Sequence, residues 1–360
     1  MTLVTWSNTT AHSLGDNTAY CVGHGNGVWI VGGGDYDMFS NGNGIIRRST
    51  NGGYNWSNIA NPFAPLGIVS AVHYANGVWV AVGGGATQSR SSVRVAVSTD
   101  DGLTWNVPSS IPALVTVEIL NDVYYSIELN QWVAVGNGGR LWTATDPSAT
   151  WTAQTSQFGS LSANCIRWSG ITWVAAGNSG HISTSSDGTT WVGQGSIAAG
   201  DVYSLSYGCG QFTCIESTGR VGISSDGINW VVSASNMVPA GAARGLGCSC
   251  GLFLAVAVSA GANASKESID SGASWQVESG AFPSGGMTSP YGGGAIVWEY
   301  IREVAYDGAG TFVAVGIGKD SFSNTFGMIN IGSSPGYNPC IADQTLILPI
   351  VSFNVEFDNP

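Results

Sequence analysis

The chain has 360 residues, of which 52 are glycine, 14 are tryptophan and only 9% are charged. Because 44% of the residues are hydrophobic, the composition excludes an intrinsically disordered chain. The net charge of −12 excludes a protein that spreads over nucleic acid or an anionic membrane. Such glycine-rich, charge-poor chains with many Val, Thr and Trp residues are typical of short strands joined by tight turns.

From the sequence we expect no segment that would send the chain into or across a membrane. No apolar run approaches the roughly 20 residues of a membrane-spanning helix. Residues 1–6 carry neither the basic region nor the apolar core of a signal peptide, so we expect no Sec-dependent export.

One phrase, an aromatic residue followed by a valine-rich run and often glycine, recurs along the chain. A repeat of this kind is the signature of an architecture built from one unit, and each copy is predicted to be the second strand of such a unit. The seven copies lie at 27–32, 77–83, 131–136, 172–177, 211–215, 252–256 and 311–316.

A second phrase, Ser-x-Asp-x-Gly-x-x-Trp with small variations, follows most of these copies. The Asp or Asn side chain suits a turn because it accepts hydrogen bonds from nearby backbone N–H groups, while glycine accepts positive φ. The third copy keeps only the Asp and the Trp, and the copy at 333–339 has lost both. The residues of these turns are Ser49, Asn51, Gly53, Trp56, Ser98, Asp100, Gly102, Trp105, Asp146, Trp151, Asp187, Gly188, Trp191, Asp226, Gly227, Trp230, Ser268, Asp270, Gly272 and Trp275.

The second phrase resembles the Asp-box, or BNR, repeat of sialidase-like β-propellers. The resemblance implies an all-β fold: a single ring of seven antiparallel blades with four strands each, in which every box joins the third and fourth strands. We therefore expect one propeller over 1–339 and a C-terminal tail over 340–360. The expected blades are 17–60, 68–109, 117–155, 162–195, 201–234, 244–279 and 300–339.

The N-terminus matches the start of a fourth strand. Residues 4–8, around Trp6, resemble 54–58 in the first box, whereas the last box is followed by no strand that begins with Trp. We therefore predict that residues 2–8 close the ring as the outer strand of the last blade. The alternative is that the apolar segment 345–351 fills that place, although Pro349 would interrupt its ladder.

Long connections are predicted to gather on the face opposite the boxes, where binding residues most often lie. They are the 2–3 connections 35–44, 84–92, 259–265 and 317–326, and the inter-blade connections 61–67, 108–116 and 280–296. The candidate binding-loop residues on them are Asp35, Tyr36, Asp37, Arg90, Tyr291, Lys319 and Asp320.

Enzymatic activity is not expected from the sequence. The sialidase resemblance implies three arginines, a Tyr–Glu nucleophile pair and an Asp acid/base, but the Arg-Ile-Pro signature is absent and no Glu is clearly paired with a Tyr. The photosystem II assembly factor type of propeller also carries such boxes and implies an arginine patch, in which this chain is not enriched.

No cofactor or metal is expected. The loop 35–43 is loosely similar to a Ca²⁺ loop but lacks its closing Glu, so a plain polar loop is the preferred interpretation. The seven cysteines lack metal-ligand spacing and are interpreted as mostly reduced thiols, with a disulfide as the alternative.

The composition and the absence of an export signal resemble bacteriophage virion proteins. We expect a non-enzymatic virion structural protein, either a capsid decoration, a head fibre or a tail component. Its partners would be other virion proteins, through residues 340–360 or the box face, and a host-surface glycan on the long-loop face. One alternative is a carbohydrate-binding or sialidase-like glycoside hydrolase propeller, which a central channel with converging Arg, Tyr and acidic side chains would support. A third option is an intracellular assembly scaffold.

Overall fold

The structure is a computed structural model in which most of the ring of sheets is described. The described residues are 5–6, 12–13, 17–34, 44–63, 67–85, 94–112, 119–197, 199–234, 236, 243–249, 252–259, 262–268, 276–277, 297–319, 321–322 and 325–333.

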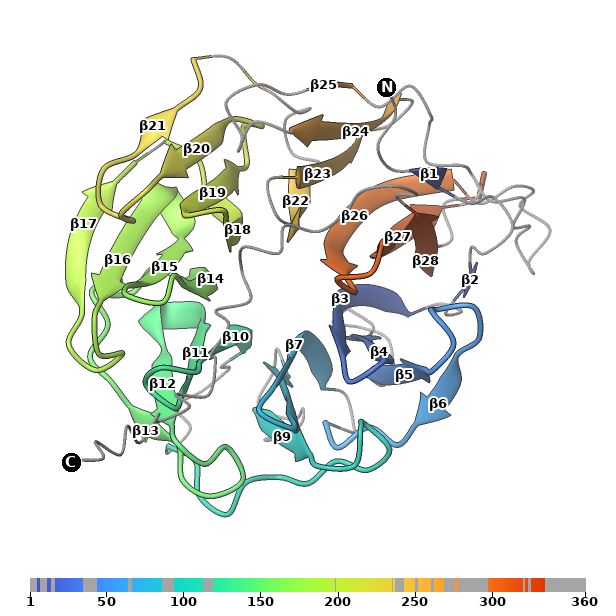
Figure 1. Cartoon of the computed structure of the whole chain (residues 1–360), viewed down its shortest axis with the longest axis horizontal. Helices are drawn as coiled ribbons and strands as arrows, with labels where there is room; N and C mark the ends of the chain where they lie inside the picture. Colours follow the sequence, from blue (N-terminus) through green and yellow to red (C-terminus); the bar gives the residue numbers. More distant parts are fainter. Residues whose placement is uncertain are drawn as a thin grey trace, which may run out of the picture.

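Antiparallel sheets stand around a common centre, each with its first strand innermost (Figure 1). Five of them have four strands each. Their strands are β3 (Thr18–Gly25), β4 (Val28–Gly34), β5 (Ile45–Ser49) and β6 (Ser57–Ile59); β10 (Leu120–Ser126), β11 (Gln131–Gly136), β12 (Leu141–Ala144) and β13 (Thr152–Ala153); β14 (Ala163–Trp168), β15 (Trp173–Gly177), β16 (His181–Ser185) and β17 (Val192–Ser196); β18 (Val202–Gly208), β19 (Gln211–Glu216), β20 (Val221–Ser224) and β21 (Val231–Val232); and β22 (Ala243–Ser249), β23 (Leu252–Ser259), β24 (Ala262–Ser268) and β25 (Gln276–Val277).

The predicted ring of seven blades with four strands each is wrong. Within the described residues, six sheets form blades of three or four strands, and the remaining sheet has five. The three-stranded blade consists of β7 (Ile68–Ala75), β8 (Val78–Gly84) and β9 (Val95–Ser98). The five-stranded sheet consists of β26 (Val297–Tyr306), β27 (Thr311–Lys319), β28 (Thr325–Ser333), β1 (Thr5–Trp6) and β2 (His12–Ser13).

The missing fourth strand beside β9 has a local cause. Val97 and Asn106 exchange both backbone hydrogen bonds at 2.8 Å, but this pairing does not continue into a strand. Pro108 follows two residues later and has no N–H to extend the ladder. The chain then turns to the next sheet, where the N–H of Ser110 donates to the carbonyl of Ala149.

Both N-terminal strands belong to the five-stranded sheet. In β1, Thr5 lies opposite Ser333 and Trp6 lies opposite Gly332, while β2 pairs with the middle of β28. The sheet therefore joins segments from the two ends of the described chain, which removes an open edge at this place in the ring. The other residues of the segment 2–8, and all of the tail 340–360, lie outside the described residues.

The repeated aromatic phrase forms the second strand of each described sheet, and in strands such as β4, β11 and β15 it is buried on both faces. Residues of β11 such as Val133 and Val135 pack with Ala175 of β15, because neighbouring sheets cover each other's faces. This burial explains a continuous apolar run in place of the alternation of a half-buried strand. Rings of the second strand lie opposite rings of the first strand in six sheets: His24–Trp29, Tyr74–Trp79, Tyr125–Trp132, Trp168–Trp173, Tyr207–Phe212 and Tyr306–Phe312.

Two of the expected long 2–3 connections are partly strand. β23 extends to Ser259 and β24 begins at Ala262, so little of the segment 259–265 is a loop. β27 likewise extends to Lys319. In contrast, β11 and β12 are joined by the short 3₁₀ turn η1 (Asn137–Gly139), and β15 and β16 by η2 (Asn178–Gly180). Within the described residues, no helix is long and apolar enough to cross a membrane.

Candidate functional site

The box turns are closed by hydrogen bonds between their own residues. The Ser98 hydroxyl donates to Asp100 (2.7 Å) and accepts from the N–H of Gly102 (2.9 Å). Asp100 Oδ1 accepts from the N–H of Thr104 (2.9 Å), and Trp105 Nε1 donates to the Gly102 carbonyl (3.2 Å). The polar atoms of this turn are thus occupied in holding its shape.

Other box turns repeat this pattern with small changes. The N–H groups of Gly53, Gly188 and Gly227 donate to the box serines Ser49, Ser185 and Ser224 at 2.8–3.0 Å. Trp191 and Trp230 donate to the box-glycine carbonyl, each at 2.9 Å. In the third turn, which lacks the glycine, Trp151 donates to Pro147 at 2.9 Å. Asp270, Gly272 and Trp275 lie outside the described residues, as does the side chain of Ser268.

Box glycines also contact the preceding sheet. A Cβ atom on Gly102 would lie 2.5 Å from Ile30 of β4, and one on Gly227 would lie 2.4 Å from Val174 of β15. Both glycines have positive φ, +79° and +77°. The glycine is therefore required both by the turn and by the junction between sheets.

The box carboxylates stabilise their own turns as ionised hydrogen-bond acceptors. Hydrogen bonds from the Thr104 hydroxyl and N–H lower the pKa of Asp100 to about 2. Hydrogen bonds from Thr190 and Asn229, respectively, lead the causes that lower the pKa of Asp187 and of Asp226. These carboxylates remain ionised acceptors for their own turns at neutral pH.

A second repeated feature lies at the other end of the ring and was not seen in the sequence. Every innermost strand, β3, β7, β10, β14, β18, β22 and β26, has a β-bulge at the same place. The bulged residue stands four positions before the residue that pairs with the buried aromatic side chain of the second strand. Since a bulge re-aims a side chain, it directs one residue of each strand away from the regular pleat. The bulged residues are Tyr20, Ser70, Asn121, Asn164, Tyr203, Arg244 and Arg302.

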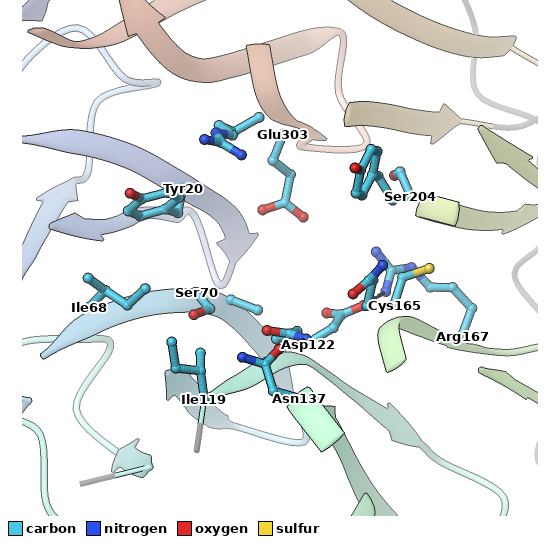
Figure 2. Close-up of a pocket in the computed structure, with 15 residues that line it drawn as sticks. Tyr20, Ile68, Ser70, Ile119, Asp122, Asn137, Cys165, Arg167, Ser204 and Glu303 are labelled. Carbon is cyan, nitrogen blue, oxygen red and sulfur yellow. Dashed lines mark hydrogen bonds and ion pairs between the residues drawn. The ribbon is translucent and has the colours of Figure 1, made fainter. Parts of the chain in front are cut away.

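The bulged residues whose side chains are described line one cavity of about 400 Å³ (Figure 2). The cavity lies at the 2–3-connection end of the ring, because Asn137 of η1 contributes to its wall. Its remaining walls come from Ile68, Ile119 and the residues that follow several bulges. We call this cavity the bulge pocket; it is lined by Tyr20, Ile68, Ser70, Ala71, Ile119, Asn121, Asp122, Asn137, Asn164, Cys165, Arg167, Tyr203, Ser204, Arg302 and Glu303.

Two asparagines fasten neighbouring sheets at this end. Asn121 Nδ2 donates to Asn137 Oδ1 (3.0 Å) and to the carbonyl of Ala163 in the next sheet (2.9 Å). Asn164 makes the equivalent bonds to Asn178 (3.0 Å) and Val202 (2.9 Å). Both amide groups are thereby held in one orientation.

Three charged residues, Asp122, Arg167 and Glu303, line the floor of the bulge pocket. We call the space at the centre of the ring, which includes this pocket, the channel. Asp122 Oδ2 accepts from Arg167 Nη1 at 2.6 Å and from the N–H of Ile166 in the next sheet at 3.0 Å. Glu303 stands at the same register in β26 and accepts from the N–H of Val22 in β3 at 2.9 Å. Figure 2 shows Glu303 and Asp122 approaching the centre from different sides.

Burial and neighbouring charges shift the pKa values of the residues at the floor of the pocket, and we call Asp122, Arg167 and Glu303 the charged layer. Desolvation raises the pKa of Glu303 to about 8, and the charge of Asp122 adds to the rise, while the Val22 N–H and Arg167 oppose it. Although burial disfavours its charge, Arg167 has a raised pKa because Asp122 lies beside it. Burial lowers the pKa of His73 to about 3, and repulsion from Arg167 adds to this, so His73 is neutral at physiological pH.

A smaller cavity of about 200 Å³ lies on the box side of the charged layer. Asp122, Arg167 and Glu303 line both cavities, so this layer lies between them. Tyrosine, histidine and aliphatic side chains line the second cavity, among them Tyr74, Tyr124 and Tyr306. The two ends of the channel therefore differ in chemistry.

The described residues provide no cluster of three or more His, Cys, Asp or Glu side chains that could hold a metal. Cys21, Cys165 and Cys214 form no disulfide, and burial raises the pKa of each thiol. The thiolate form is therefore suppressed at these positions.

Of the binding-loop residues predicted from the sequence, the structure describes the backbone of Lys319. Lys319 lies within β27, where its backbone pairs with Val297 and Thr325, and is not a loop residue. The other candidates, Asp35, Tyr36, Asp37, Arg90, Tyr291 and Asp320, lie outside the described residues.

Comparisons with known proteins show the fold of the chain. No family model matches it, and no curated protein matches it. The structure is similar to that of YCF48 bound to D1 peptide, with a TM-score of 0.59 and 14% identity over 91% of this chain and 96% of that chain. It is also similar to the computationally designed Ika8 protein, with a TM-score of 0.52 and 12% identity over 88% of this chain and 87% of that one. The chain is thus a β-propeller.

Proposed function

We propose that this protein is a non-enzymatic binding propeller whose bulge pocket holds the ligand. The observation that carries the proposal is the repeated bulge, which turns residues such as Tyr20, Asn121 and Tyr203 from different sheets into one cavity. Concave sites with converging polar groups are where small ligands and chain segments bind.

A protein partner is one source of the ligand. YCF48, which shares the fold, was solved with a D1 peptide. A glycan is the other class of ligand. A carbohydrate-binding propeller is expected to have a channel with converging Arg, Tyr and acidic side chains. Arg167, Tyr203 and Glu303 fit this description.

An array experiment tests the binding proposal. The wild-type protein and the variant Ser70→Tyr are applied to a peptide array and a glycan array. Ser70 stands at the register where β3 and β18 carry Tyr20 and Tyr203, so the backbone accepts Tyr there while the new ring fills the pocket. We expect wild-type signals that Ser70→Tyr loses. Signals that Ser70→Tyr leaves unchanged would contradict the proposal.

We further propose that the propeller is a structural component of a virion: a capsid decoration, a head fibre or a tail part. The support is compositional: a scarcity of charge, an excess of glycine and a net charge of −12. Mass spectrometry of purified phage particles tests this role. Stoichiometric recovery of the chain in particles would support it, and recovery only in the lysate supernatant would exclude it and favour an intracellular scaffold.

A glycoside hydrolase is the second candidate. Glu303, with its pKa raised to about 8, keeps its proton at neutral pH beside the ion-paired Asp122, and glycoside hydrolysis uses a protonated and an ionised carboxyl group. However, both carboxylates already fasten sheets through Ile166 and Val22. We expect no fluorophore release from 4-methylumbelliferyl glycosides. Release by the wild type that Glu303→Gln abolishes would establish the enzyme instead.

A further inference from the structure

The bulge pocket offers mainly uncharged hydrogen-bonding groups to a ligand. Ser70 and Ser204 contribute hydroxyl groups, and Asn121 and Asn164 contribute amides. The apolar part of the lining comes from Ile68, Ala71, Ile119 and the thiol of Cys165.

The two amides present fixed acceptors. Each Nδ2 group already donates two hydrogen bonds, which for Asn121 go to Asn137 and Ala163. The amide oxygen is then the remaining polar atom of the side chain, and the neighbouring sheet holds it in place. A preorganised acceptor of this kind suits a ligand hydroxyl, which donates one hydrogen bond and accepts others.

Each ionic group that lines the pocket already has a contact within the protein. Arg167 is 2.6 Å from Asp122, and the Arg302 guanidinium lies 5.3 Å from the ring centre of Tyr20. A ligand carboxylate would compete with the Asp122 carboxylate for Arg167, which Asp122 already holds in a short ion pair. Charge therefore disfavours an acidic ligand at the floor of the pocket.

The aromatic residues of the pocket complete a sugar-like set of contacts. Tyr20 and Tyr203 stand at the bulges of β3 and β18 and combine a ring with a hydroxyl group. Rings that border polar amides can cover the apolar face of a sugar while amides and hydroxyls meet its edges. The volume of about 400 Å³ lies in the range of small-ligand pockets.

From these contacts we infer that the bulge pocket binds a neutral saccharide, a compact polyhydroxylated ligand without an ionised group. This inference rests on the proposed function, since it names the ligand class of the same pocket. It excludes sialylated glycans and peptides as the principal ligands.

The test compares neutral saccharides with an acidic one. Lactose, maltotriose and N,N′-diacetylchitobiose are the neutral probes, and 3′-sialyllactose is lactose with an acidic residue added. Binding is measured by titration calorimetry on the full chain. We expect saturable binding of at least one neutral probe, and weaker binding of 3′-sialyllactose than of lactose.

A pair of matched variants assigns the binding to the pocket. Ser204→Ala and Ser206→Ala are the same substitution two positions apart on β18, but Ser204 lines the bulge pocket and Ser206 lines the smaller cavity beyond the charged layer. Loss of one ligand hydrogen bond weakens binding about three- to tenfold. We expect that loss for Ser204→Ala, and a change within about twofold for Ser206→Ala.

The outcomes separate the inference from the proposed function. Equal losses in the two serine variants, or preference for 3′-sialyllactose over lactose, would overturn the inference. If peptides bind the wild type, Ser70→Tyr blocks them and no neutral probe binds, the ligand class is wrong while the binding propeller stands. If Ser70→Tyr blocks nothing that the wild type binds, both fail.

Discussion

The box turns and the channel use polar side chains for different purposes. In the box turns, Ser98 and Asp100 bond to backbone groups a few residues away, so each turn is closed by its own sequence. In the channel, Asp122 and Glu303 bond to backbone groups of the next sheet, and Asp122 also pairs with Arg167. The turns can therefore repeat along the chain, while the channel residues form a single site only after the ring closes.

The two regions also respond to pH in opposite ways. Box aspartates have lowered pKa values, so they contribute stability above the unfolded Asp pKa of about 3.9 and lose it as the pH falls. Glu303 has a raised pKa and holds a proton that the unfolded chain releases. Its contribution is therefore lost as the pH rises from about 4.3 toward 8.

The largest effect is expected from Asp122→Ala in the channel. The substitution leaves Arg167 without its carboxylate, at a site where the Arg167 and Asp122 side chains are only 17% and 13% exposed. Breaking a largely buried pair from one side costs about 3–5 kcal/mol of unfolding free energy. Urea denaturation measures this cost.

The control for that change is the double variant Asp122→Ala with Arg167→Met. Since it removes the unpaired charge as well, it should recover part of the lost stability. A double variant less stable than the sum of the single changes would contradict the ion-pair explanation.

The next effect is expected at a box glycine. Gly227→Ala introduces a Cβ atom 2.4 Å from Val174 at a φ of +77°, and we expect a loss of about 2–4 kcal/mol. Gly77→Ala is the matched control: its φ is +78° and nothing lies within 4 Å of the added atom, so only about 1 kcal/mol should be lost. Equal losses in thermal or urea unfolding would show that the contact between sheets contributes nothing.

A smaller, pH-dependent effect is expected for Glu303→Gln. The amide keeps an acceptor for the Val22 N–H but carries no charge beside Asp122, Arg167, Arg302 and Cys21. Between pH 5 and pH 8 the wild type should lose about 1–2 kcal/mol relative to the variant. Unfolding curves across this range measure the difference, and parallel pH profiles would rule out a raised Glu303 pKa.

The smallest effect is expected for Asp187→Ala in a box turn. The side chain accepts hydrogen bonds from the N–H groups of Thr189 (2.7 Å) and Thr190 (2.6 Å) but is exposed to solvent. Removing a capping carboxylate of this type costs about 1 kcal/mol. The cost should shrink as the pH falls below the unfolded Asp pKa of about 3.9, because protonation removes the carboxylate acceptor, and a pH-independent cost in urea titrations would point to packing instead.

The box turns could be predicted from the sequence because the hydrogen bonds that form them are local. Serine, aspartate and glycine are required at fixed spacing within one turn, so the same letters recur at Ser98–Gly102 and Ser224–Gly227. The buried aromatic residues recur for a similar reason, since each second strand lies between two sheets. The number of strands in each sheet could not be predicted from the repeats, because Pro108 ends one blade early and two N-terminal strands join another sheet.

The bulge pocket was missed because its residues share a position and not a side chain. Tyr20, Ser70, Asn121 and Arg302 occupy one register in different sheets, and no single residue type is common to all the sheets at this register. The available signal was spacing: each stands four residues before the residue opposite the buried aromatic ring. Asp122 and Glu303, one residue later, would have emerged from the same alignment.

One titration tests the central claim, that the bulge end of the channel is the binding site. Ser70→Tyr copies Tyr20 into the bulge pocket, and Ser206→Tyr copies Tyr124 into the cavity on the other side of the charged layer. Each variant is titrated with the array probe that the wild type binds most tightly. We expect at least a roughly tenfold loss of affinity for Ser70→Tyr, because the new ring occupies the ligand's place, and little change for Ser206→Tyr. Unchanged affinity in Ser70→Tyr, or a comparable loss in both folded variants, would contradict the account.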